Sequence, residues 1–175
     1  MLVLGLAWYA GAQAPYTHSL GVTFGNMEAF SYKIFLTDNI AISADVGFKW
    51  TLTRATYHEK GTNYIWRGST TPMTIELNPN IMYESPAGRN NLYWFAGAGL
   101  SAGYAWSNYQ YEWGVARISY GKFGMNAIGG VEYKFKFPLT LQADFRPGFG
   151  LLFNHNYNVT YFDWGIFVGA RYTIR

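Results

Sequence analysis

The sequence predicts an all-β protein, an eight-stranded antiparallel up-and-down transmembrane β-barrel. Two observations carry this prediction: residues alternate between apolar and polar with a period of two along about eight segments, and the connections between segments alternate in length. Composition agrees, because aromatic residues make up 20% of the 175 residues and charged residues only 13%, against about 25% in a typical soluble domain. The mean hydropathy is −0.06, so the apolar surface must arise from the alternation.

The first 14 residues are expected to be a signal peptide or its remnant, and residues 15–175 the barrel domain. The stretch MLVLGLAWYAGAQA is apolar and ends in Ala12-Gln13-Ala14, which resembles a signal-peptidase site. It is too short to cross a bilayer as a helix, which takes about 20 residues. An N-terminal strand or a wrongly assigned start codon is the alternative.

The alternating segments follow one another to the end of the chain. They cover residues 19–25, 31–36, 40–52, 72–83, 91–106, 122–137, 139–153 and 164–175. In the last segment, WGIFVGARYTIR, Trp164, Ile166 and Val168 lie on one face, whereas Arg171 lies among glycines on the other. Successive side chains of a strand point to opposite faces, so each segment has one apolar face and one small or polar face.

The connections are expected to be short at one end of the barrel and longer at the other. Short ones lie at residues 37–39, 85–90 and 137–138, and long ones at 53–70, 107–121 and 154–160. The connection at residues 25–29 is short although it lies on the long side. This asymmetry is typical of outer-membrane barrels, whose strands of about 10 residues cross the bilayer.

A soluble, lipocalin-like barrel is the alternative to a membrane barrel. Its second face would meet water, but that face is rich in glycine here, which adds no charge and fits a crowded interior better. The apolar face also carries aromatic residues towards the strand ends, as membrane barrels do at both interfaces. These aromatic residues are Trp50, Tyr83, Trp94, Tyr104, Trp106, Tyr133, Phe135, Trp164 and Tyr172.

The second face is therefore expected to line a lumen that contains charges of both signs. The predicted lumen charge network consists of Asp45, Lys49, Glu76, Glu132, Asp144, Arg146 and Arg171, with Lys33 and Lys134 on the same face. An ion path or proton relay is one interpretation. A structural plug is the other, favoured because an eight-stranded interior is just wide enough for its side chains. Bulky residues are expected there too: Phe35, Tyr93, Phe95, Ile128 and Phe167.

The chain resembles the small eight-stranded outer-membrane barrels of the OmpA transmembrane domain, OmpX and OmpW type, in the form common in Bacteroidetes. The resemblance covers roughly residues 17–175 and rests on the signal-like start, the eight alternating strands and the aromatic-rich end FDWGIFVGARYTIR. It implies a porin-like barrel in the outer membrane of a Gram-negative cell. Its partners would be the lipid bilayer, lipopolysaccharide and, through the long loops, another outer-membrane protein.

Neither a catalytic site nor a cofactor or metal site is expected. Some small outer-membrane barrels modify lipids, and such enzymes need a His beside a nucleophile or carboxylate. The candidates are His18 next to Ser19, His58 next to Glu59, and His155 between two asparagines. We interpret them as ordinary polar residues. Nucleic-acid binding is excluded because the net charge of +3 is small and scattered, and without Cys the chain has neither disulfide nor thiolate ligands.

The long loops are the expected place of function. Tyr64, Trp66, Tyr111 and Trp113 are the candidate contacts there, because aromatic residues near arginines are typical of binding surfaces. Packing of the same residues on one another, on the barrel rim or among headgroups remains an equal alternative. The sequence thus predicts a plugged barrel with a structural or interaction role, against a narrow channel for small solutes or ions.

Overall fold

The computed structural model describes residues 16–50, 53–59, 61, 65–70, 73–88, 91–111, 114–155 and 157–174. Its strands are β1 (His18–Gly25), β2 (Met27–Phe35), β3 (Ile40–Trp50), β4 (Thr53–Glu59), β5 (Ile65–Thr70), β6 (Met73–Pro86), β7 (Leu92–Tyr111), β8 (Gly114–Lys134), β9 (Leu139–Phe153) and β10 (Tyr157–Ile174). In this described part of the chain, no helix is long and apolar enough to cross a membrane.

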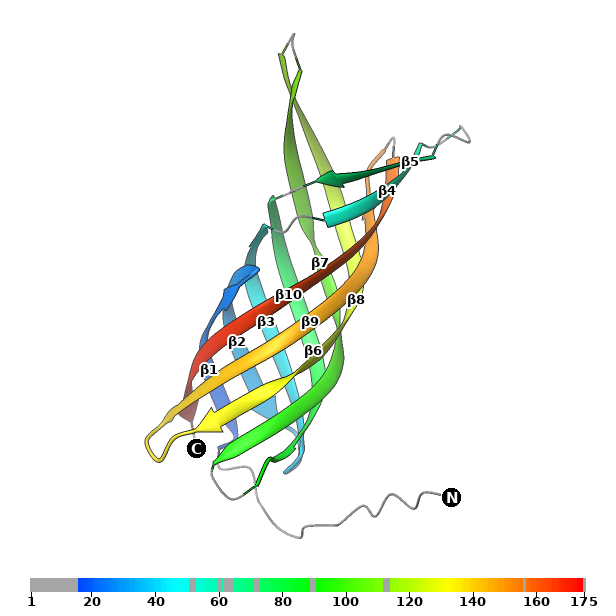
Figure 1. The fold of residues 1–175 in the computed structure, drawn as a ribbon. Helices are drawn as coiled ribbons and strands as arrows, with labels where there is room; N and C mark the ends of the chain where they lie inside the picture. The colour runs from blue at the N-terminus through cyan, green and yellow to red at the C-terminus, as the bar shows by residue number, and fades with distance from the viewer. Residues whose placement is uncertain are drawn as a thin grey trace, which may run out of the picture.

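Eight of these strands close a barrel. They are hydrogen-bonded in the order β1-β2-β3-β6-β7-β8-β9-β10, and β1 also pairs with β10, so the sheet closes on itself. Each pairing is antiparallel, as between His18 and Ile174 where the barrel closes. Figure 1 shows the strands steeply tilted around the barrel axis. The predicted all-β, eight-stranded up-and-down barrel is confirmed.

The short turns and the C-terminus lie at one end, here called the turn end, and the opposite end is called the loop end. At the turn end, the Leu36 N–H donates to the Ile40 carbonyl at 2.8 Å between β2 and β3, and the Phe135 N–H donates to the Leu139 carbonyl at 3.0 Å between β8 and β9. Between β6 and β7, Gly88 adopts a φ of 104°, which residues with a Cβ rarely adopt. The chain therefore reverses tightly at this end.

The loop end contains more strand than the sequence predicted. Residues 53–70 were expected to be a loop, yet β4 and β5 form a hairpin, and β4 pairs with the outer part of β10, from Tyr157 to Phe162. The reason lies in β1, which ends at Gly25 opposite Phe167 and leaves the rest of the β10 edge to be covered by β4. Likewise β7 and β8 stay paired as far as Tyr111 and project beyond the barrel (Figure 1).

The outer face of the barrel is a continuous apolar surface. Exposed side chains at mid-height include Val46, Leu77 and Val168, and all three point away from the lumen. Among the strand residues whose side chains are described, Glu28 is the only charged one on this face. A closed barrel has no unpaired sheet edge, so this surface is suited to lipid.

Aromatic rings flank the apolar surface at both ends. At the turn end, the ring centroids of Tyr83 and Trp94 lie 5.8 Å apart. At the loop end, those of Tyr104 and Trp106 lie 6.2 Å apart. Such girdles sit at the two membrane interfaces of outer-membrane barrels.

Candidate functional site: the charged lumen

The inner face carries a chain of ion pairs that runs along the lumen. The structure places all seven residues of the predicted network inside: Asp45, Lys49, Glu76, Glu132, Asp144, Arg146 and Arg171. Lys49 is the most exposed of them, with a side-chain exposure of 12%. Because the alternation of each strand fixes which side chains point inward, these residues converge although they come from β3, β6, β8, β9 and β10.

Three further charged residues belong to the same network and were missed in the sequence. Glu84, Lys122 and Asp163 are buried and each forms an ion pair. The sequence did contain a signal for them, because each continues the alternation of apolar and polar residues at the end of a segment. Glu84 lies one residue beyond the expected end of 72–83, and Asp163 one residue before 164–175.

The turn-end cluster consists of Lys33, Glu84, Glu132, Lys134 and Arg171. The Lys33 Nζ lies 2.8 Å from a carboxylate oxygen of Glu132 and also bonds Glu84, which accepts a second ion pair from Lys134. A nitrogen of Arg171 lies 3.8 Å from Glu132. Each carboxylate is thus shared by at least two cations, which offsets the cost of burying it.

Tyr16 closes the turn-end cluster from outside the ladder. It precedes β1, yet it is only 4% exposed, and its hydroxyl donates to Glu132 at 2.6 Å. Its ring meets Phe35 edge to face at 5.2 Å. Burial, and then the Glu132 and Glu84 carboxylates, raise the pKa of the phenol far above its ordinary value, so Tyr16 stays a neutral donor.

The middle cluster is centred on Arg146. Its guanidinium reaches Asp144 at 2.5 Å and Asp45 at 2.5 Å, so strands β9 and β3 are joined across the lumen. Gln142 donates to Asp144 and accepts from Arg171, which links this cluster to the turn-end cluster. The face of the Phe167 ring covers the guanidinium at 4.6 Å. A cation held between two carboxylates and a ring fills this level of the barrel.

Asparagines occupy the lumen beside the middle cluster. The Asn126 amide donates to the side-chain oxygen of Asn80 at 2.7 Å, and the Asn80 amide donates to the Asn78 carbonyl at 3.0 Å. Pro79 has no N–H, and the β6–β7 register is interrupted beside it. The side chain of Asn80 therefore supplies a hydrogen bond close to the gap that proline leaves in the ladder.

The loop-end cluster consists of Lys49, Glu76, Lys122 and Asp163. Lys122 pairs with Glu76 and lies 3.6 Å from Asp163, which is held more closely by Lys49 at 2.6 Å. The Tyr161 ring lies 4.7 Å from the Lys122 ammonium. These charges therefore form one connected group across β3, β6, β8 and β10.

Tyr161 itself packs into space left by glycine. A Cβ added at Gly124 would meet the Tyr161 hydroxyl oxygen at 2.3 Å, and one at Gly150 would meet it at 2.8 Å. The same hydroxyl lies 3.2 Å from the Ser101 hydroxyl. Glycine on the inner face thus makes room for a large ring in a narrow barrel.

Across the three clusters the charges balance. The ion-paired lumen residues comprise six cations (Lys33, Lys49, Lys122, Lys134, Arg146 and Arg171) and six anions (Asp45, Glu76, Glu84, Glu132, Asp144 and Asp163). Apolar side chains close the spaces towards both ends, with Phe35, Phe95 and Ile128 at the turn end and Leu152 at the loop end. In the described lumen, buried apolar side chains thus lie beside ion-paired residues whose charges sum to zero.

The candidate loop contacts fall where side chains are not described. Tyr64 and Trp113 lie outside the described residues, and the side chains of Trp66 in β5 and Tyr111 in β7 are not described either. Their role as contacts stays a prediction.

In the described residues, His18 and Ser19 do not form the nucleophile–base pair considered in the sequence. His18 points outward and its ring nitrogen lies 2.7 Å from the Tyr32 hydroxyl, whereas Ser19 points into the lumen. Adjacent residues on opposite faces cannot act as a nucleophile–base pair. Within the described part, no group of three or more His, Asp or Glu residues could hold a metal ion. His58 has no described side chain.

The closed ladder, the apolar outer face and the filled polar lumen define a membrane-spanning β-barrel of the outer-membrane type. Neither a protein-family model nor a curated protein sequence matches the chain. Solved structures do resemble it. The N-terminal β-barrel domain of Pseudomonas aeruginosa OprF is 14% identical, with 90% of this chain and 95% of that chain covered and a TM-score of 0.53.

Two further structures show the same fold. Neisserial surface protein A is 16% identical, with 90% and 93% of the two chains covered and a TM-score of 0.55. A major outer membrane protein from Thermus thermophilus is 12% identical, with 90% and 98% covered and a TM-score of 0.53. The chain therefore has the fold of the small eight-stranded outer-membrane β-barrels.

Proposed function

We propose that this chain is a small barrel of the bacterial outer membrane, with a plugged polar lumen and a structural or interaction role. Residues 1–14 would be its signal peptide and residues 15–175 the barrel domain. The bilayer is the environment that the apolar outer face suits, and lipopolysaccharide would surround the loop end. The observation that carries the proposal is the filled lumen, in which twelve charged groups pair with one another.

The physical reason is that the ion-paired side chains and rings that occupy the described lumen would leave no continuous water column. The turn-end, middle and loop-end clusters each reach across the lumen, and an eight-stranded barrel has room for its side chains and little more. Opening a path for ions would mean separating buried pairs, which costs several kcal/mol for each pair. The plug thus supports a structural or interaction role rather than transport.

Permeability tests this part of the proposal against a narrow channel. Liposomes that contain the folded barrel should not swell in small sugars, and planar bilayers should show no stable single-channel steps. Steps whose ion selectivity changes on Arg171→Glu would establish the channel instead. Hydrolysis or transfer of acyl chains by the pure protein would establish a lipid-modifying enzyme.

The interaction role rests on the strands that project at the loop end. The β7–β8 hairpin and the β4–β5 hairpin project at the loop end of the barrel (Figure 1). We expect Tyr64, Trp66, Tyr111 and Trp113 to contact another outer-membrane protein or a glycan there. Trp66→Ala with Trp113→Ala should abolish co-purification of such a partner while the barrel stays folded. Unchanged co-purification would contradict this role for the loops.

A further inference from the structure

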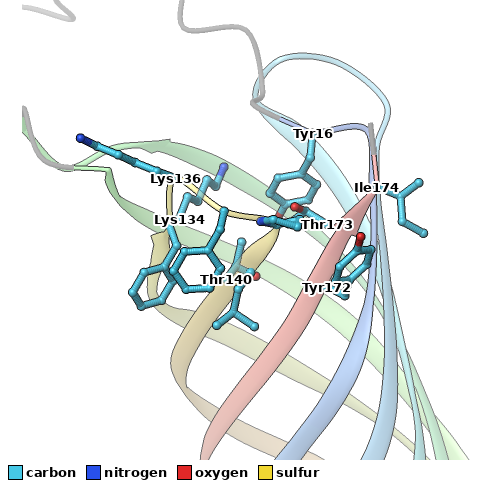
Figure 2. A pocket seen from close by; sticks show the side chains of 11 residues that line it. Tyr16, Lys134, Lys136, Thr140, Tyr172, Thr173 and Ile174 are labelled. Carbon is cyan, nitrogen blue, oxygen red and sulfur yellow. The ribbon is translucent and has the colours of Figure 1, made fainter.

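A pocket lies at the turn end, between the β8–β9 turn and the last residues of β10. It has a volume of about 450 Å³, and Figure 2 shows Tyr16, Lys134 and Thr140 around it. Its walls are held together by the backbone. The Thr173 N–H donates to the Pro138 carbonyl at 3.3 Å, and the Thr17 N–H donates to the Ile174 carbonyl at 3.3 Å. The pocket is thus built from the barrel itself.

The pocket has an apolar side and a polar side. Phe137, Tyr172 and Ile174 line it from the exposed outer face, so this side is continuous with the lipid-facing surface. Tyr16 and Thr140 line it from the buried inner side. The pocket therefore spans the boundary where acyl chains give way to headgroups.

The polar side is suited to an anion. The hydroxyl oxygen of Thr140 is buried and has no hydrogen-bond partner, although Thr140 is only 1% exposed. Lys136 lies on the rim, is exposed, and forms no ion pair with any described residue. Figure 2 shows its side chain extending away from the turn and from the other lining residues, so rotation of its flexible stem brings the ammonium group to the pocket mouth when an anion binds.

The charges of the turn-end cluster also favour an anion in this pocket. Beneath the pocket, the turn-end cluster holds three cations, Lys33, Lys134 and Arg171, against two carboxylates, Glu84 and Glu132. The local excess is positive, and Lys136 adds to it. A phosphate group accepts hydrogen bonds from ammonium and hydroxyl donors, so its chemistry matches what the pocket offers.

We propose that this pocket binds the phosphate group of an anionic phospholipid from the leaflet around the turn end. The acyl chains would lie along Phe137, Tyr172 and Ile174, with the phosphate between Lys136 and Thr140. This inference rests on the proposed membrane insertion, and it adds a specific lipid site to it.

Native mass spectrometry tests the site. The folded protein is released from nanodiscs of phosphatidylcholine with a minor fraction of phosphatidylglycerol, and the retained lipids are weighed. The wild type should retain one phosphatidylglycerol in preference to phosphatidylcholine. Lys136→Gln should lower that retention roughly fivefold, because one lysine near an anionic membrane surface contributes about 1 kcal/mol. Thr140→Val, which keeps the shape but removes the hydroxyl, should also lower it.

A matched control removes the same charge elsewhere. The control is Lys60→Gln, at a position that follows Glu59 in the sequence, and it should leave retention unchanged. Equal retention by Lys136→Gln and Lys60→Gln, or no preference for phosphatidylglycerol in the wild type, would overturn the site. Displacement of the lipid by millimolar inorganic phosphate would assign the pocket to a free anion and also overturn it.

Failure of this inference differs from failure of the proposed function. A folded barrel migrates differently on gels before and after boiling, and this shift is read on the same nanodisc samples. A barrel that inserts but retains no phosphatidylglycerol overturns only the lipid site. A chain that does not insert overturns both.

Discussion

Replacing Glu132 by glutamine should destabilise the barrel strongly. The carboxylate is fully buried and receives the Lys33 ammonium at 2.8 Å and the Tyr16 hydroxyl at 2.6 Å, with Arg171 at 3.8 Å. Glu132→Gln keeps the shape but leaves the turn-end cluster with three cations and Glu84 as the remaining carboxylate. Removing one partner of a buried pair costs about 3–5 kcal/mol. Because Lys33 still forms an ion pair with Glu84, we expect a loss of unfolding free energy at the lower end of this range, about 3 kcal/mol.

Urea unfolding of the barrel in lipid vesicles measures this loss, with the gel shift as the readout of the folded fraction. Glu28→Gln is the matched control, since Glu28 is exposed on the outer face, and it should change the free energy of unfolding by less than about 0.5 kcal/mol. Lys33→Gln combined with Glu132→Gln should recover much of the loss, because both members of the pair are removed. A loss below about 1 kcal/mol for Glu132→Gln, or additive effects in the double variant, would refute the pairing.

Three further changes test other parts of the fold. Val168→Lys places a charge on the apolar outer face and should lower the free energy of unfolding in bilayers by about 2–4 kcal/mol. The control, Asp38→Lys in an exposed turn, should change it little. Equal losses for the two variants would argue against lipid contact at Val168. Gly124→Ala puts a Cβ 2.3 Å from the Tyr161 hydroxyl oxygen and should cost about 1–3 kcal/mol in the same assay, a loss that Tyr161→Phe should partly relieve. Tyr16→Phe removes the donor to Glu132 and should cost about 1.5–3 kcal/mol; a neutral effect would show that Tyr16 does not hold the turn end closed.

The sequence predicted most of the barrel because a strand's alternation is fixed by geometry. The faces of Ile166 and Arg171 follow from their positions in one segment, without any knowledge of the neighbouring strands. The inward residues of eight closed strands must then meet, so the converging charges could be anticipated as a set. Which charge pairs with which could not, since the pairing of Arg146 with Asp45 depends on the register and shear of the closed sheet.

Other features left no periodic signal. Tyr16 lies before the first strand, yet its side chain is buried against Glu132, which no alternation describes. The β4–β5 hairpin forms because β10 extends beyond β1, and its residues have no apolar face that would mark them as strands. Sequence reasoning therefore works best where one face meets lipid and least well where the chain leaves the bilayer.

Cysteine reactivity along β10 tests the central claim, a lipid-facing outer surface around a closed lumen. The chain has no Cys, so a Cys introduced singly is the only thiol that can react. The positions to be substituted are Ile166, Phe167, Val168 and Gly169. In folded, vesicle-inserted protein, Cys at 166 and 168 should react with a lipid-soluble maleimide. Cys at 167 and 169 should react with neither that reagent nor a charged, water-soluble methanethiosulfonate until urea unfolds the barrel. Fast reaction of 167 and 169 with the water-soluble reagent in the folded state would show an open aqueous lumen, and fast reaction of 166 and 168 with it would show an outer face in water.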